Sequence, residues 1–244
     1  MIEIIPAILS KNFSDIEHNL AQIVGGVSIV QIDICDGMFV QNRTWPFEGY
    51  GAKNQAYLKD HDIQTLEKEE TGMPYWDTMD YELDLMVQDP ATILKDLMII
   101  GPKRVVIHFD SIKNIDNGPE EFFNNLDPFY KNQIEIGLAV TSKNTLTEIE
   151  NIIPHISFIQ CMGIEHVGFQ HQEFDTHILE TIKTLRSKYP DMPISVDGAV
   201  NMGTIDDLID AGATRLVVGS AIWETEIPSE TLHEFKEIAK ERSV

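Results

Sequence analysis

The chain has 244 residues, of which 43% are hydrophobic and 24% charged, a composition typical of globular proteins. Its 40 acidic and 18 basic side chains give a net charge of −22, which disfavours binding to nucleic acids and to anionic membrane surfaces. No stretch is apolar over the ~18 residues of a membrane span, and residues 1–6 lack the basic flank of a signal peptide. We therefore expect a single cytoplasmic domain over residues 1–244, with Cys35 and Cys161 as reduced, buried thiols.

Apolar segments of strand length alternate with amphipathic segments along the whole chain. Strands are predicted over residues 2–9, 27–34, 81–87, 104–108, 134–140, 156–162, 193–196 and 215–219. Helices are predicted over residues 13–23, 91–100, 119–130, 146–153, 174–189, 203–211 and 229–242. Repeated units of this kind indicate a parallel sheet, and eight units in ~250 residues match a closed (β/α)8 barrel. The alternative is an open doubly wound sheet, although residues 7–10 lack the Gly-rich turn that usually follows its first strand.

The connection between the second and third predicted strands is longer than the others. Residues 45–80 are rich in Lys, Glu, Asp, Gly and Tyr, and their apolar periodicity is weak. We expect a helix and an extended loop, inserted on the side of the barrel that carries the active site. We expect its aromatic residues to anchor the insertion to the barrel rather than to contact a ligand or a neighbouring subunit. These residues are Trp45, Tyr50, Tyr75 and Trp76.

Polar and sulfur-containing side chains stand where the predicted strands end. They are Ser10, Gln31, Asp33, Asp84, His108, Met162 and Asp197. In a (β/α)8 barrel the carboxyl ends of the strands form one mouth, so acids from distant strands converge there. Asp33 and Asp197 come from strands far apart in the ring and can exchange protons with opposite faces of a substrate, which inverts a carbon beside a carbonyl. This task requires pKa values raised from ~4 towards neutrality by burial or neighbouring acids.

Two turns of small residues indicate where an anion would bind. Gly198-Ala199 follows the seventh strand and Gly219-Ser220 follows the eighth, and each turn precedes a helix. The loops after these strands often bind phosphate through backbone N–H groups in such barrels, and small residues let an anion approach. Close packing of turns would explain the same residues, just as a helix cap would explain a single Asp at a strand end.

A series of segments carries a more specific pattern. They are residues 6–10 with Phe13, 31–40 with Asn42 and Thr44, 84–87 with Pro90, 107–108, 195–198, 211–213 and 218–222. With the block Asp-x-x-Asp-Gly-x-Phe-Val at 33–40, the sequence resembles the ribulose-phosphate 3-epimerase family over nearly its whole length, the insertion excepted. The resemblance implies a (β/α)8 barrel that interconverts D-ribulose 5-phosphate and D-xylulose 5-phosphate by moving a proton at C3. It also implies a homo-oligomer.

The resemblance assigns roles to individual residues. The two acid/base aspartates of the family correspond to Asp33 and Asp197, its first-strand serine to Ser10, and two of its pocket methionines to Met86 and Met162. A third pocket methionine is replaced by cysteine in this chain. The expected substrate-binding residues are Ser10, Met86, His108, Met162, Gly198, Ala199, Gly219 and Ser220.

The metal site implied by the resemblance is altered. The family holds a divalent metal with two histidines and the two catalytic aspartates, but Gln31 and Asp84 stand at the histidine positions. The resulting set of Gln31, Asp33, Asp84 and Asp197 offers only oxygen ligands, which suit Mg²⁺, Mn²⁺ or Ca²⁺ better than Zn²⁺. The alternative is a metal-free pocket in which one carboxyl stays protonated, and such a protein would be a poor epimerase.

The segment after the sixth strand also departs from the family. The Gly-rich phosphate loop is replaced by residues 165–172, where Glu165 would repel a phosphate and His166 or His171, if protonated, could offset that repulsion. An ordinary solvated loop would explain the same histidines. The substrate could therefore be another sugar phosphate or an unphosphorylated sugar. A second hypothesis is a catalytically impaired barrel that binds a sugar phosphate or a protein partner in a regulatory role. A decarboxylase of similar fold is disfavoured because residues 33–36 lack the lysine of its Asp-x-Lys-x-x-Asp strand.

Overall fold

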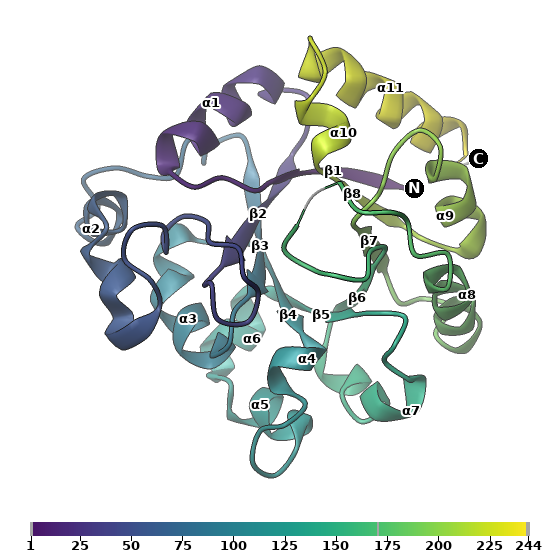
Figure 1. Ribbon diagram of the computed structural model, residues 1–244, viewed down its shortest axis with the longest axis horizontal. Helices are drawn as coiled ribbons and strands as arrows, with labels where there is room; N and C mark the ends of the chain where they lie inside the picture. The colour runs from purple at the N-terminus through teal and green to yellow at the C-terminus, as the bar shows by residue number, and fades with distance from the viewer. Residues whose placement is uncertain (1, 170, 243–244) are drawn as a thin grey trace.

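The computed structural model describes residues 2–169 and 171–242, and this part of the chain folds as a closed barrel. Its parallel strands follow one another around the ring in sequence order, and β8 pairs with β1 (Figure 1). The strands are β1 (Glu3–Ile8), β2 (Ile29–Cys35), β3 (Asp80–Met86), β4 (Arg104–His108), β5 (Glu135–Val140), β6 (Phe158–Met162), β7 (Ile194–Asp197) and β8 (Arg215–Val218). The (β/α)8 prediction is confirmed, and the pairing of β1 with β8 excludes an open sheet.

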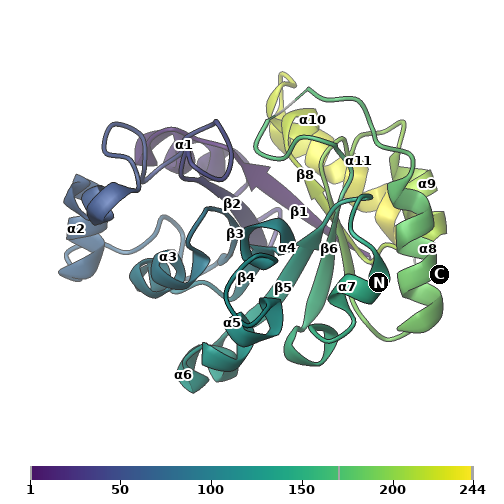
Figure 2. The same ribbon diagram turned by 60° about the horizontal axis from the view of Figure 1, so that its bottom comes forward.

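Helices surround the strands and cover their outer faces (Figures 1 and 2). The α-helices are α1 (Phe13–Ile23), α2 (His61–Glu67), α3 (Pro90–Leu97), α4 (Phe109–Ile112), α5 (Pro119–Asn125), α6 (Pro128–Gln133), α7 (Leu146–Ile149), α8 (Ile178–Lys188), α9 (Ile205–Ala211), α10 (Ser220–Trp223) and α11 (Pro228–Glu241). The 3₁₀ helices are η1 (Lys53–Lys59), η2 (Met98–Ile100) and η3 (Ile153–His155). Apolar residues at helical spacing dictate which face is buried: α1 packs Ile16, Leu20 and Ile23 into the core. No helix in residues 2–169 and 171–242 is long and apolar enough to span a bilayer.

The predicted helices differ from the observed ones mainly where a proline interrupts the helix or where the helix is only one turn long. Residues 119–130 form two helices because Pro128 starts a new one, α6, whose first turn is capped by the Asp127 side chain. Residues 146–153 contain the single turn α7, with its capping box formed by Thr145 and Glu148, and end where η3 begins. The turns α4 and α10 were not predicted, because four residues are too short to show periodicity.

Residues 45–80 connect the carboxyl end of β2 to the start of β3 and contain η1 and α2. Helix α2 buries Ile63 and Leu66 and lies on the outside of the barrel (Figure 1), so it occupies the place of a normal crossover helix rather than the mouth. Trp45 is buried against Phe13, with ring centroids 5.2 Å apart. Tyr75 also packs against the core, whereas Tyr50 and Trp76 are exposed. The anchoring role expected for four aromatic residues is therefore wrong for Tyr50 and Trp76.

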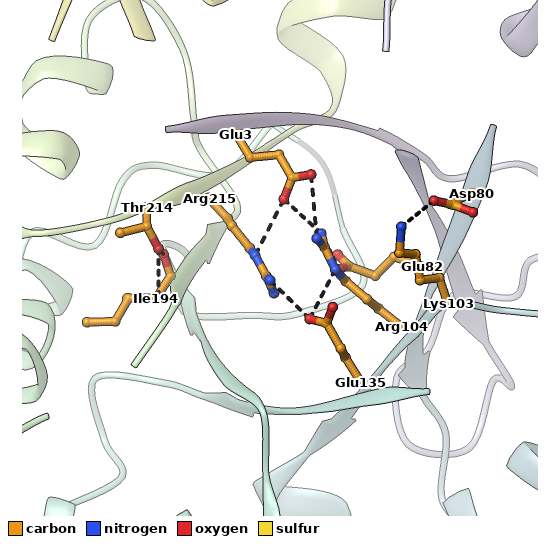
Figure 3. A network of polar contacts seen from close by, with 9 residues as sticks. All are labelled: Glu3, Asp80, Glu82, Lys103, Arg104, Glu135, Ile194, Thr214 and Arg215. Atoms are coloured by element: carbon orange, nitrogen blue, oxygen red, sulfur yellow. Dashed lines mark hydrogen bonds and ion pairs between the residues drawn. The ribbon is translucent and has the colours of Figure 1, made fainter. Parts of the chain in front are cut away.

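The floor of the barrel is a network of charged side chains, shown in Figure 3. Arg104 Nη1 lies 2.8 Å from Glu3 Oε2, and Arg215 Nη2 lies 3.0 Å from Glu135 Oε2. Each arginine also contacts the other glutamate at 3.4 Å, so the ion pairs form a ring that links strands across the barrel. Glu82 is fully buried beside this ring, 3.7 Å from Arg104, and burial raises its pKa to about 8. These charges occupy the barrel interior at the amino-terminal ends of the strands.

Candidate functional site

Three carboxylates converge at the carboxyl end of the strands. Asp33 on β2, Asp84 on β3 and Asp197 at the end of β7 each place an oxygen within 4.8 Å of the other two. The parallel register sets Asp33 directly beside Asp84, and closure of the barrel brings Asp197 to them from the far side of the ring. Three acids this close are electrostatically unfavourable unless protons, hydrogen-bond donors or a cation compensate their charge.

Two glutamine amides bridge these acids. Gln31 Nε2 donates to Asp33 Oδ1 at 2.8 Å and to Asp197 Oδ2 at 3.0 Å. Gln160 Nε2 lies 3.2 Å from Asp84 Oδ2 and 3.4 Å from Asp197 Oδ2. Sequence reasoning missed Gln160, although it stands two residues before Met162 on β6, and alternate residues of a strand face the same side. The amide oxygens of both glutamines are buried without a hydrogen-bond partner.

The pKa values of the acid pair are raised. Burial is the main cause for Asp33, and the charges of Asp197 and then Asp84 raise its pKa further above the usual range. Burial also raises the pKa of Asp197 to about 7, and the charge of Asp84 contributes in the same direction. The hydrogen bonds from Gln31 act against both shifts. A carboxyl group whose pKa lies near the working pH can both accept and return a proton efficiently.

His108 lies beside Asp84 rather than in the open part of the site. Its Nε2 atom is 2.7 Å from Asp84 Oδ1, and both side chains are buried. The Phe39 ring packs against the imidazole, with centroids 5.5 Å apart. His108 therefore fixes the orientation of the Asp84 carboxylate, and the substrate contact expected of it from the sequence stays a prediction.

A cavity of about 390 Å³ opens above the acids. Of the predicted site residues, the cavity is lined by Asp33, Met86, Met162, Asp197, Gly198, Ala199, Gly219 and Ser220. Gln31, Asp84 and His108 are buried beside it and are not among its lining residues. Ser10 is also outside the lining, and its backbone oxygen accepts a hydrogen bond from the Trp45 backbone N–H. The structure thus brings the acid pair and both small turns to one cavity.

The turns after β7 and β8 form one end of this cavity. Gly198 and Ala199 both have positive φ angles, 95° and 55°. Such a conformation costs a residue with a side chain on the order of 1 kcal/mol, and strain of this kind is concentrated at functional sites. Gly219 precedes the single turn α10, whose first N–H groups have no acceptor within the helix. These features suit an anion at this end of the cavity.

The segment after β6 is arranged differently from the sequence expectation. Glu165 points to Lys143, with Nζ and Oε1 2.6 Å apart, and is not among the cavity-lining residues. The acid that reaches this end of the cavity is Glu224, which follows α10 and pairs with His171 Nε2 at 2.6 Å. His166 is also outside the lining. Lys143 is therefore the main partner that compensates the charge of Glu165, and the charge of His166 acts in the same direction.

The donor set fits a hard divalent cation. Asp33, Asp84 and Asp197 supply carboxylate oxygens that are close enough to share one ion. The unpartnered amide oxygens of Gln31 and Gln160 are further oxygen donors, which a half-turn of either amide would direct towards the acids. An all-oxygen set of this type is suited to Mg²⁺, Mn²⁺ or Ca²⁺ and lacks the nitrogen and sulfur ligands that favour Zn²⁺.

Comparison with known proteins identifies the family. The model of the ribulose-phosphate 3 epimerase family matches residues 3–223. The chain belongs to this family. Among curated relatives, the ribulose-phosphate 3-epimerase of Candida glabrata is 24% identical over 235 residues, covering 96% of this chain and 91% of the relative. The cytoplasmic isoform of Oryza sativa subsp. japonica is 28% identical over 233 residues, covering 94% and 91%.

Solved structures agree on the fold of this family member. The 3-hexulose-6-phosphate synthase of Salmonella typhimurium superposes with a TM-score of 0.67 at 11% identity, covering 99% of this chain and all of that one. KGPDC of Streptococcus mutans gives a TM-score of 0.64 at 13% identity and 98% coverage of both chains. At these identities the similarity shows the barrel fold alone.

Proposed function

We propose that this family member is an epimerase that inverts C3 of a ketose phosphate, with D-ribulose 5-phosphate and D-xylulose 5-phosphate as the first pair to test. The observation that carries the proposal is the placement of Asp33 and Asp197. They line one cavity from strands far apart in the ring, and their pKa values are raised. The family and the names of its curated relatives support the same activity.

The proposed reaction removes the proton from one face of the substrate carbon and adds a proton on the opposite face. One aspartate, ionised, removes the C3 proton, and the electron pair of that C–H bond passes into the adjacent carbonyl to give an enediolate. The other aspartate, protonated, returns a proton to C3 from the opposite face, which leaves the inverted carbon. Gln31 donates hydrogen bonds to both acids and so fixes their positions relative to each other. A divalent cation held by Asp33, Asp84 and Asp197 would stabilise the negative charge that develops on the substrate oxygens.

The rest of the cavity orients the sugar. Met86 and Met162, both buried, give it an apolar wall near the acids. The turns at Gly198-Ala199 and Gly219-Ser220 would hold the phosphate at the far end through backbone N–H groups. A phosphate bound at that end would anchor one end of the sugar. The number of carbons between the phosphate and C3 would then place C3 between the two carboxylates.

The test is solvent-deuterium exchange at C3, followed by NMR in D2O with added Mg²⁺ or Mn²⁺. The unaltered protein should incorporate deuterium into both epimers and interconvert them. Asp33→Asn and Asp197→Asn should each abolish interconversion but retain exchange into one epimer, and the retained epimer should differ between the two variants. Asp77→Asn, an exposed acid, is the control. Absence of exchange in the unaltered protein with every divalent ion would refute the proposal.

The second candidate is a barrel that binds a sugar phosphate in a regulatory role without catalysis. It is favoured by one observation: the amide N–H groups of Gln31 and Gln160 already compensate the acids without a cation. This candidate predicts tight ligand binding together with no exchange. The double variant Gln31→His, Asp84→His distinguishes the two, because it should create zinc-dependent exchange if the metal ligands alone were lost.

A further inference from the structure

The far end of the cavity combines an acidic residue with the turns suited to an anion. The charged or titratable side chains among the described lining residues are Asp33, His171, Asp197 and Glu224. Glu224 follows α10, and its backbone N–H bonds to the oxygen of Ser220 at 3.0 Å, so it stands one turn from the Gly219-Ser220 turn. An unpaired carboxylate here would repel a phosphate dianion, and the net charge of −22 adds to that repulsion.

His171 is the one described lining residue that can carry a positive charge. Its Nε2 atom lies 2.6 Å from Glu224 Oε1, which joins the segment after β6 to the end of α10. Its backbone has a positive φ of 61°, a conformation that non-glycine residues adopt only when their surroundings impose it. The contact places one imidazole nitrogen against the carboxylate and leaves the other ring nitrogen for a ligand.

Described residues on either side of His171 in the sequence make their own hydrogen bonds. Asn42 Nδ2 donates to the backbone oxygen of Gly168 at 3.1 Å, which ties the segment to the loop after β2. Gln172 Nε2 bonds to the oxygen of Phe169 at 3.2 Å, and its Oε1 accepts from the His166 backbone N–H. These bonds are made by residues other than His171. Replacing its side chain should therefore change the charge at the cavity without releasing the segment.

We propose that His171 determines specificity for a phosphorylated ligand, because its imidazole pairs with Glu224 at the end of the cavity formed by the turns after β7 and β8. This inference rests on the proposed function in assuming that the substrate is a ketose phosphate. It goes further by naming the side chains that admit the phosphate. The glycine-poor segment after β6 thus supplies a charge pair at the phosphate end of the cavity.

The test measures binding of xylitol 5-phosphate by isothermal titration calorimetry. This ligand has no carbonyl and cannot be epimerised, so its binding is independent of the acid pair's chemistry. His171→Gln should weaken binding about tenfold, because it exposes the carboxylate of Glu224. The double variant His171→Gln, Glu224→Gln should recover most of the lost affinity. His166→Gln, on the same segment but outside the cavity lining, should bind as the unaltered protein does.

Other outcomes would overturn the inference. They are no binding of xylitol 5-phosphate to the unaltered protein, unchanged affinity in His171→Gln, or no recovery in the double variant. The loss in His171→Gln should also shrink in high salt, because ions screen exposed charges. A different result would refute the proposed function alone. In that case the protein would bind xylitol 5-phosphate but would catalyse no deuterium exchange at C3 of ribulose 5-phosphate.

Discussion

Gln31 on β2 donates a hydrogen bond to Asp197 on β7, at 3.0 Å and across the mouth of the barrel. The same amide donates to Asp33, so a single side chain contacts both members of the proposed acid pair. A hydrogen bond to the ionised form of a carboxyl group lowers its pKa. Gln31 therefore limits how far burial and mutual repulsion raise the two pKa values.

Gln31→Leu should raise the pKa of both acids, because it removes the donor and leaves the burial. The ionised base would then form only at higher pH, so the acid limb of the profile of kcat/KM against pH should move upward. Activity at neutral pH should fall on the order of tenfold, and activity at pH 9 should change less. Gln133→Leu, on the exposed end of α6, is the control. An unmoved acid limb would contradict this role of Gln31.

Asp84→Asn should weaken the binding of Mn²⁺ about 10- to 100-fold, a loss typical when a metal site loses one contributing group. Asp84 shares the cluster with Asp33 and Asp197, and its Oδ1 atom lies 2.7 Å from His108 Nε2. Paramagnetic resonance of free Mn²⁺ gives the affinity directly, without an activity assay. Asp191→Asn, an exposed acid, should bind as the unaltered protein does. Equal affinities in all three proteins would mean that the cluster does not hold the ion.

The barrel and the convergence of the acids could be predicted from sequence for a physical reason. Strand periodicity and strand-end acids are local features, and the closed parallel topology determines where such ends meet. That reasoning places Asp33 and Asp197 at one mouth without any contact being known. It does not determine which side chains bridge them. Gln160 looks like an ordinary strand residue until the register shows that it faces the acids.

The contacts of the far cavity end could not be predicted, because they join segments that are distant in sequence. His171 and Glu224 are 53 positions apart, and neither belongs to a motif. The sequence indicates Glu165 as the acid nearest a bound phosphate, because it lies at the position of the phosphate loop. In the structure Glu165 forms an ion pair with Lys143 instead. Such pairings depend on loop conformation, which depends in turn on tertiary contacts rather than on local propensity.

Glu82→Gln should reduce the pH dependence of stability in the metal-free protein. Burial raises the pKa of Glu82 to about 8 in the folded chain, so the folded chain keeps a proton that the unfolded chain releases above its ordinary pKa of 4.5. The free energy of unfolding therefore falls as pH rises from about 4.5 to about 8, by at most ~1.4 kcal/mol per pH unit from this group. The amide cannot ionise, so this contribution disappears.

Urea unfolding in EDTA at several pH values between 5 and 8 measures this slope. The difference between Glu82→Gln and the unaltered protein isolates the contribution of Glu82 from that of the other acids. Glu17→Gln, an exposed residue of α1, controls for the change in net charge. Parallel curves for Glu82→Gln and the unaltered protein would show that Glu82 is ionised in the folded chain across this range.

Gly137→Ala should destabilise the barrel by about 1–3 kcal/mol, because the added methyl group overpacks the interior. A Cβ atom at Gly137 would lie 2.4 Å from the Phe158 ring, and Arg215 stands over that ring at 4.8 Å from its centroid, so the ring has little room to withdraw. Gly203→Ala is the matched control, since its nearest neighbour is the Asn201 side chain at 3.2 Å on the surface. Urea unfolding at one pH compares the variants. If both unfold alike, the Phe158 ring is not seated against Gly137, and the interior packing of β5 and β6 differs from the one described.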